Sequence, residues 1–484
     1  MRRFTLPIGL ALAALVFYVI AQSADGGTVA DVATEAGPLT ERTVTPVLSA
    51  RRLPEFIVAP TADAALAAEL DGIIADSPAD TCLVVSRAGR PIYSHNPTTP
   101  LVPASAQKVV SGAGVLEALG PDYTFTTTVS AVQPLDGGVL DGDLWLIGGG
   151  DPVLATAAYI GRYPEPQLFT DFERLAQDLV DAGLTRVTGA VVGDETRYDT
   201  QRYVDSWPAR FTNQGDRPQN QSGPLTALSV NDAFSQWPTD SDANSLATAA
   251  TDPATTAAAE FDDLLEDRGV VIERSARSGI APEGLILLGS LESAPLTAIV
   301  GQMLGSSDNT TAELLVKELG WAVAGEPTTN AGVTVLDDVL VELGIPDEAT
   351  RSADGSGLSS LNALSCSALV ELLDQAGPDS ALAAGLAIAG ETGTLRERFE
   401  DETVRGRILA KTGSLNQVSA LAGFALAGDD TDDPTLLTFA YIANAEDLEF
   451  TRAKAIEGEM GADLVSWPEG PDLGELAPAP AESG

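Results

Sequence analysis

The chain has 484 residues, more than one hydrophobic core usually serves, so two or more domains are expected. Its apolar share of 44% is ample for packed cores. With 70 acidic against 27 basic residues, the formal net charge is −43. This charge argues against binding of nucleic acid and against docking on anionic lipid through a basic patch. It indicates a solvated acidic surface that favours solubility.

The N-terminal residues 1–23 have the pattern of an export segment. Two arginines precede an apolar run from Phe4 to Ala21, whose length lies between that of a signal peptide and that of a spanning helix. Cleavage near Ser23 and retention as a membrane anchor are both open. In either case the body of the protein is predicted to lie outside the cytoplasm, and only this segment to contact the membrane.

A linker is expected over residues 24–58, which are rich in small residues and proline and lack periodicity. The spacing of apolar residues then predicts alternating helices and strands. The first group comprises a helix at 62–75, strands at 82–85 and from 91, and a helix at 106–119 that Gly120 and Pro121 end.

A second group of elements follows, with strands at 125–132, 144–147, 187–192, 270–273 and 285–288 and helices at 172–182 and 255–267. Further helices are expected at 296–304, 310–324 and 450–459, with strands at 418–426 and 436–442. Residues 468–484 read as a disordered tail. Antiparallel strands with flanking helices indicate an α+β fold rather than a doubly wound sheet.

The two cysteines, Cys82 and Cys366, both flank predicted core elements. In an oxidising compartment an even count favours a disulfide between them. Two separate buried thiols, each acting as a small hydrophobic residue, are the alternative.

Ser105 and Lys108 form a candidate nucleophile and base. A serine hydroxyl needs an adjacent base, and lysine can act as one when burial or a nearby cation lowers its pKa. Three positions apart at a helix start, both side chains lie on one face. The alternative is that the serine only caps the helix and the lysine only lies in solvent. A second lysine, Lys411, is expected to lower the pKa of Lys108 further.

Two more motifs follow in the chain. The first is Ser307-Asp308-Asn309. Its spacing alone is weak evidence for a site, because Ser-x-Asn also occurs at four other places. Only at Ser307, however, is the middle residue Asp. Lys411-Thr412-Gly413-Ser414 occurs once, after an apolar approach suited to a core strand. Each could be an ordinary turn. Together with Ser105 and Lys108 they supply a nucleophile, a base, a proton relay and a cationic clamp for a carboxylate.

Other chemistries are disfavoured. His95, the only histidine, lies in a polar turn, so a Ser-His-Asp triad is not expected. One histidine and two separated cysteines cannot form a typical zinc shell, and no metal or cofactor is expected. Lysine is rare, at positions 108, 317, 411 and 454. Since arginine stays protonated and cannot serve as a base, this usage favours a chemical role for Lys108. It supports the same for Lys411 to a smaller extent, because an arginine could also clamp a carboxylate.

The motifs resemble those of class C low-molecular-mass penicillin-binding proteins of actinobacterial type, a family of D-alanyl-D-alanine carboxypeptidases and endopeptidases. The likeness covers about Pro54 to Trp467. Its motifs lie at residues 103–108, 148–152, 229–231, 307–309, 354–357, 393–395 and 410–414. The long interval from Ser105 to Ser307 fits this family, which carries extra domains there. The loop at 354–357 is expected to be structural and to border the cleft.

The resemblance implies a discontinuous domain of the serine β-lactamase and transpeptidase type, an antiparallel sheet flanked by helices, over residues 59–124 and 293–467. A β-rich accessory insertion is expected at 125–292. Ser105 would attack the bond between two terminal D-alanines, Lys108 would take its proton, and Ser307 with Lys411 would pass a proton to the leaving nitrogen.

The remaining implied roles concern substrate binding. Asn309 would bind the substrate amide and hold Lys108. Lys411, Thr412 and Ser414 would hold the terminal carboxylate, within a binding motif that includes Gly413. Backbone N–H groups of Ser105 and Ser414 would form the oxyanion hole. The expected partners are peptidoglycan stem peptides and β-lactams, the latter acylating Ser105.

Two alternatives stay open at this point, a β-lactamase and a catalytically silent protein that binds the cell wall. Carboxypeptidase and endopeptidase action use the same residues, so the sequence does not rank them. The oligomeric state is also open.

Overall fold

The computed structural model describes residues 54–212, 219–241, 246–345, 350–428 and 435–468. The expected export segment and most of the expected linker and tail lie outside these ranges. Helix α2 (Pro54–Asp76) begins earlier than expected, so residues 54–58 belong to it and not to the linker. Proline suits this position because the first helical turn needs no N–H donor. Within the described ranges, no helix is long and apolar enough to cross a membrane.

The first sheet is antiparallel and has the strand order β15-β16-β17-β18-β1-β2. Its strands are β1 (Asp80–Arg87), β2 (Arg90–His95), β15 (Ala387–Ile388), β16 (Ile408–Leu415), β17 (Val418–Ala427) and β18 (Thr435–Asn444). The N-terminal strand β1 pairs with β18, with Val84 opposite Ala440. An early and a late strand of the described chain are therefore neighbours in one sheet.

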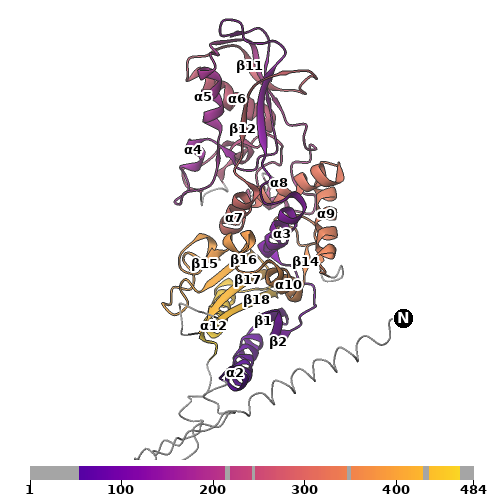
Figure 1. Cartoon of the computed structure of the whole chain (residues 1–484), viewed down its shortest axis with the longest axis vertical. Coiled ribbons are helices and arrows are strands. Elements are labelled where there is room, and N and C mark those ends of the chain that lie inside the picture. Colours follow the sequence, from indigo (N-terminus) through magenta and orange to yellow (C-terminus); the bar gives the residue numbers. More distant parts are fainter. Residues whose placement is uncertain (1–53, 213–218, 242–245, 346–349, 429–434, 469–484) are drawn as a thin grey trace, which may run out of the picture. The chain divides into compact units, whose positions relative to one another are not determined.

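Helices cover both faces of this sheet (Figure 1). Successive side chains of a strand point to opposite faces. Accordingly Val84 packs with α3 (Gln107–Leu119) and α10 (Cys366–Ala376). Its neighbour Val85 packs with α2 and with α12 (Phe450–Ser466). Strand β1 is therefore buried on both faces.

Three more helices complete the core on the α3 side, namely α7 (Leu296–Ser306), α8 (Asn309–Leu319) and α9 (Thr329–Glu342). The sequence predicted one helix from 310 to 324; the structure ends the α-helix at Leu319 and continues it as a π-helical turn, Gly320–Ala324. Packing against α3 is close: a Cβ at Gly114 would lie 2.2 Å from the side chain of Leu336 on α9.

A second sheet lies between α3 and α7 in the sequence, with the order β11-β8-β5-β3-β12 and β4 attached to β8. Its strands are β3 (Thr126–Ala131), β4 (Val139–Leu140), β5 (Leu144–Ile147), β8 (Arg186–Asp194), β11 (Val271–Ser278) and β12 (Ile286–Glu292). Strand β8 runs parallel to β4, β5 and β11, while β3 is antiparallel to β5 and β12.

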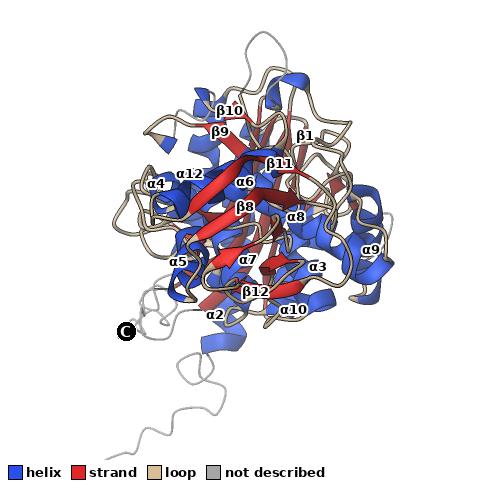
Figure 2. Cartoon of the chain, turned by 90° about the horizontal axis from the view of Figure 1, so that it is seen from above, coloured by secondary structure: helices blue, strands red, loops and turns tan. Residues whose placement is uncertain are grey.

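Helices α5 (Phe172–Asp181) and α6 (Pro253–Glu266) form the crossovers that parallel pairing requires and pack on this sheet (Figure 2). The rings of Phe172 and Phe261 are 5.1 Å apart in its core. The segment is therefore a mixed α and β structure, with helices where 172–182 and 255–267 were predicted.

Short elements connect these layers. They are β6 (Leu154–Ala155), β7 (Thr170–Asp171), β9 (Phe234–Gln236), β10 (Thr248–Ala249), β13 (Thr350–Arg351), β14 (Ala363–Leu364), α4 (Ala157–Ile160) and α11 (Ala381–Ala384). The described residues from Glu55 onward form one compact unit.

Candidate active site

Ser105 lies in a single 3₁₀ turn, Ala104–Ala106, immediately before α3. Ala104 has a φ of 48°, a left-handed conformation that is uncommon for a residue with a side chain. The turn rests on Gly357, where an added Cβ would lie 1.9 Å from the carbonyl oxygen of Ala104. Glycine at 357 thus permits the close approach that holds this turn, with Ser105 half-buried between buried neighbours.

Lys108 brings several of the motifs together. It lies in the first turn of α3, and its side chain is fully buried. Its Nζ is 3.2 Å from Ser105 Oγ, 2.6 Å from Asn309 Oδ1 and 2.7 Å from the carbonyl oxygen of Ser356. This geometry places the candidate base within hydrogen-bonding reach of the candidate nucleophile.

Burial lowers the pKa of Lys108 to about 8, although the charges of Asp354, Asp308 and Glu313 act in the opposite direction. Burial, followed by the charge of Lys108, lowers the pKa of Lys411 well below its ordinary value. Burial is thus the main cause that prepares Lys108 as a base.

The second motif forms the corner between α7 and α8. Ser307 closes α7 with a φ of 61°, and the side chain of Asp308 caps α8 by accepting from Thr311 N. Asn309 accepts from Lys108 through Oδ1 and donates through Nδ2 to the carbonyl oxygen of Gln221, 2.6 Å away. Among the described residues, Ser307 Oγ has no hydrogen-bond partner. The structure thus joins Asn309 to Lys108 and leaves the Ser307 hydroxyl unengaged.

The third motif lies on β16. Lys411 is fully buried and donates to the carbonyl oxygen of Thr412, and Thr412 Oγ1 donates to Thr394 Oγ1 2.9 Å away. Gly413 allows this strand to pack on the nucleophile's turn, because a Cβ there would lie 2.5 Å from the carbonyl oxygen of Pro103. Ser414 is exposed. The strand that carries the clamp residues is therefore in direct contact with the turn before Ser105.

The loop Asp354–Gly357 contributes more than the structural role that the sequence suggested, since its Ser356 carbonyl accepts from Lys108. Asp354 is fully buried and accepts from four donors, which are Gly357 N, Ser359 N, Asn362 Nδ2 and Trp207 Nε1. Glu313 on α8 accepts from the N–H groups of residues 355 and 356.

Sequence reasoning missed Glu313, Trp207 and Gln221. A carboxylate in the buried stretch of a helix was the available signal for Glu313. No local pattern marks the other two, because each acts through one hydrogen bond to a distant part of the chain.

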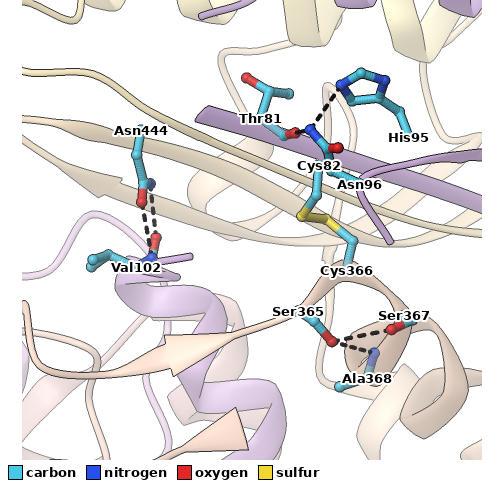
Figure 3. The surroundings of a disulfide bond; sticks show 10 residues. All are labelled: Thr81, Cys82, His95, Asn96, Val102, Ser365, Cys366, Ser367, Ala368 and Asn444. Atoms are coloured by element: carbon cyan, nitrogen blue, oxygen red, sulfur yellow. Dashed lines mark hydrogen bonds between the residues drawn. A yellow bond between two sulfur atoms is a disulfide. The ribbon is translucent and has the colours of Figure 1, made fainter. Parts of the chain in front are cut away.

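Cys82 and Cys366 form a disulfide that joins β1 to the first residue of α10 (Figure 3). Their Cα atoms are 5.9 Å apart, within the usual range for this bond. In the same view, His95 lies beside Asn96 at the end of β2, with its Nε2 3.0 Å from Asn96 Nδ2. In the described structure neither His95 nitrogen is bonded to a serine, so the geometry does not build a triad.

One group in the described residues could offer three carboxylates to a metal, namely Asp262, Asp263 and Glu266 on α6. It lies on an outer helix of the second sheet, apart from the motifs. Exposed acidic groups of this kind are common on acidic surfaces, and it plays no part in the site described above.

Comparison with known proteins places this arrangement among relatives. The sequence matches the D-Ala-D-Ala carboxypeptidase 3 (S13) family over residues 66–236 and 235–462. A D-alanyl-D-alanine carboxypeptidase of Actinomadura sp. (strain R39) is 29% identical over 446 residues, which cover 77% of this chain and 78% of that protein. A carboxypeptidase of Mycobacterium tuberculosis is 30% identical over 372 residues, 74% of each chain.

Solved structures show the same fold. Penicillin binding protein 4 from Haemophilus influenzae has a TM-score of 0.66 at 20% identity, covering 84% of this chain and 99% of that one. A predatory peptidoglycan endopeptidase of Bdellovibrio bacteriovorus has a TM-score of 0.51 at 16% identity, covering 81% and 93%. The α+β fold expected from the motifs is confirmed.

Proposed function

Because the chain belongs to the D-Ala-D-Ala carboxypeptidase 3 (S13) family, we propose that it is a serine peptidase of peptidoglycan stem peptides with Ser105 as its nucleophile. The observation that carries this proposal is the position of Lys108 Nζ, buried and within 3.2 Å of Ser105 Oγ. Its activity would be carboxypeptidase, endopeptidase or both, and β-lactams would acylate the same serine.

Acylation begins when neutral Lys108 takes the proton of Ser105 Oγ as that oxygen bonds to the carbonyl carbon between two D-alanines. The oxyanion that forms accepts from the backbone N–H groups of Ser105 and Ser414, an arrangement usually worth about 3–4 kcal/mol. The C–N bond then breaks, and Ser307, together with Lys411, passes to the leaving nitrogen the proton that Lys108 took from Ser105. A water molecule then attacks the acyl carbon, one of its protons returns through Lys108 to Ser105 Oγ, and the acyl portion leaves as a carboxylic acid.

Substrate placement follows from the surrounding groups. Asn309, fixed between Lys108 and Gln221, would bind the amide of the acyl portion. Lys411, Thr412 and Ser414 would hold the carboxylate of the departing portion, on the strand that Gly413 brings against the turn of Ser105.

We assign residues 59–124 and 293–467 to the catalytic domain and 125–292 to an accessory insertion. Residues 1–23 are proposed to direct export, so that the protein acts outside the cytoplasmic membrane at the cell wall. These assignments follow from the motif order and from the apolar N-terminal run.

Labelling with a fluorescent penicillin tests the nucleophile. The wild type should form a covalent adduct on the peptide that contains Ser105, and Ser105→Ala should form none. Ser306→Ala, which changes a neighbouring exposed serine of the second motif's corner, is the matched control and should label like the wild type. Equal labelling of wild type and Ser105→Ala would reject Ser105.

Measuring the fate of the adduct and the release of D-alanine from a pentapeptide separates the alternatives. A long-lived adduct with D-alanine release supports the peptidase. Rapid turnover of penicillin without D-alanine release would indicate a β-lactamase, and absence of both reactions a silent wall-binding protein.

A further inference from the structure

The loop Asp354–Gly357 holds the candidate base and is itself bonded to two helices. On one side its carbonyl groups accept from α3. Ser111 Oγ donates to the carbonyl oxygen of Gly355 at 2.6 Å, and Lys108 Nζ donates to that of Ser356 at 2.7 Å. The two donors are three positions apart on α3 and so lie on one face of it. The place of Lys108 Nζ therefore depends on where this loop lies.

Helix α8 holds the opposite side of the loop. The N–H groups of Gly355 and Ser356 donate to the same carboxylate oxygen, Glu313 Oε1, at 3.1 and 2.8 Å. The loop and the helix are in close contact, because a Cβ at Gly355 would lie 2.7 Å from the carbonyl oxygen of Ala312. Each of the two loop residues is thus bonded through its carbonyl group to α3 and through its N–H group to α8.

These two hydrogen bonds do not explain why the acceptor is a carboxylate. The oxygen of a glutamine amide can also accept from N–H groups. Glu313 is fully buried, and a charged group in such a place is costly unless an opposite charge and hydrogen bonds compensate it. The charge therefore needs a cation nearby.

That cation is Lys108. The charge of Glu313 raises the pKa of Lys108, as do the charges of Asp354 and Asp308, against the larger lowering by burial. Lys411 is the fourth charged group that faces Lys108, and its own pKa is lowered by the charge of Lys108. Burial, followed by the charge of Asp354, raises the pKa of Glu313. A proton on Lys108 thus favours the charged form of Glu313, and the reverse also holds.

The proposed acylation step places a new charge among these groups. Lys108 begins as a neutral amine and becomes an ammonium when it takes the proton of Ser105 Oγ. The neighbouring carboxylates differ in their other tasks: Asp354 accepts from four donors, and Asp308 caps α8. Both N–H donors to Glu313, in contrast, belong to the loop that accepts from Lys108.

We propose that Glu313 is a positioning residue for Lys108: it fixes the loop whose carbonyl oxygen accepts from Nζ, and its negative charge stabilises the ammonium that forms there. The proposal rests on the proposed function, in which Lys108 takes the proton of Ser105. Glu313 acts through Ser356 and Lys108, and the substrate does not contact it.

Three glutamine substitutions test this role. Glu313→Gln keeps an oxygen for the two N–H groups and removes the charge. Glu318→Gln, on the same helix, removes an equally buried carboxylate, one that pairs with Arg197. Glu342→Gln, at the exposed end of α9, is the surface control. The rate of acylation by a fluorescent penicillin is measured on the purified full-length proteins from about pH 6 to about pH 10, and circular dichroism at each pH verifies folding.

The midpoint of the pH profile should lie at about 8 in the wild type. In Glu313→Gln it should fall by about 0.5 pH unit or more, because the ammonium loses an anion, and acylation at high pH should slow by about tenfold. Glu318→Gln should unfold at a lower urea concentration but keep the wild-type midpoint, and Glu342→Gln should match the wild type in both respects. A folded Glu313→Gln with the wild-type midpoint, or an equal shift in Glu318→Gln, would overturn the inference.

Glu313→Asp takes the place of Glu313→Gln if the latter does not fold. It keeps the charge but withdraws the carboxylate from the loop by one methylene group, so acylation should slow by about tenfold across the whole pH range. Acylation by Glu313→Asp at the wild-type rate would show that Glu313 does not position the base. A wild type that penicillin does not label would instead contradict the proposed function.

Discussion

At the scale of single residues, the decisive feature is the burial of the Lys108 side chain away from solvent. Lys108 cannot be replaced by arginine if it must accept a proton, because a guanidinium stays charged at all working pH values. Lys108→Arg should therefore lower the rate of acylation by penicillin by about 10²–10⁴-fold. Lys454→Arg, an exposed lysine of α12, should acylate like the wild type. Stopped-flow measurement with a fluorescent penicillin checks both, and normal acylation by Lys108→Arg would exclude Lys108 as the base.

The pH dependence of acylation follows from the same group. Only the neutral amine can take the proton of Ser105, and its pKa is lowered to about 8. The acylation rate of the wild type should therefore rise as the pH passes upward through about 8 and then level off. A rate that declines across this interval would contradict the assignment. The protein must stay folded throughout, which circular dichroism at each pH verifies.

Residue type and motif order were enough to predict which residues of the candidate site lie together, and their catalytic roles stay predictions. Ser105, Lys108 and Asn309 are joined in the structure as the sequence implied. The sequence did not show that burial is the largest cause of the lowered pKa of both Lys108 and Lys411. Gln221 could not be predicted, because it contributes a backbone carbonyl, which every residue type has.

At the scale of elements, the loop Asp354–Gly357 connects Trp207, which lies between the first and second motifs, to the candidate base Lys108. Trp207 Nε1 donates to Asp354 Oδ2 at 2.7 Å, and Ser356 of the same loop accepts from Lys108. Trp207→Phe keeps the ring but removes this donor. It should lower the free energy of unfolding by about 1–3 kcal/mol and slow acylation by penicillin, because a buried carboxylate loses one partner.

Trp321→Phe is the control for that substitution, since the Trp321 side chain is 40% exposed and lies outside the loop. Urea unfolding and the acylation rate should both separate the two variants. If Trp207→Phe acylates and unfolds like the wild type, the loop does not depend on this contact.

The disulfide joins two elements that are far apart in the sequence, since the sequence separation of its cysteines is 284. The Cys82→Ser, Cys366→Ser double variant should unfold with a free energy about 2–5 kcal/mol lower than the oxidised wild type, chiefly because the unfolded chain is no longer constrained. Urea titration with and without reductant checks this. The reductant should bring the wild type to the variant's midpoint, and coincident midpoints without reductant would contradict the prediction.

Most elements could be predicted from periodicity, including the strand at 144–147 and the helix predicted at 106–119, which the structure has as α3 from Gln107 to Leu119 after a separate 3₁₀ turn. Pairing in the second sheet could not. Parallel contacts between β5, β8 and β11 depend on where α5 and α6 cross over, which is a property of the whole segment. The start of α2 was missed because small residues and prolines, here Pro54 and Pro60, read as linker.

At the scale of the whole molecule, the net charge of −43 sets the response to salt. Repulsion among the excess of carboxylates opposes the compact state, and salt screens it over about 10 Å at 0.1 M. The midpoint of thermal unfolding should therefore rise when sodium chloride is raised from about 0.02 M to about 0.5 M. Sucrose at matched osmolarity is the control, and a midpoint that does not rise with salt would show that local ion pairs outweigh the repulsion.

The two ends of the segment that carries the second sheet meet. Thr126 on β3 lies opposite Glu292 on β12 in the antiparallel pair, and Leu296 N donates to the carbonyl oxygen of Tyr123. In engineering terms the segment could be excised and its ends rejoined by a very short bridge. Yet Asp354 would then lose Trp207, and the buried Glu318 would lose Arg197. The two ends could be joined easily, but the shortened chain would lack hydrogen bonds that hold the loop next to Lys108.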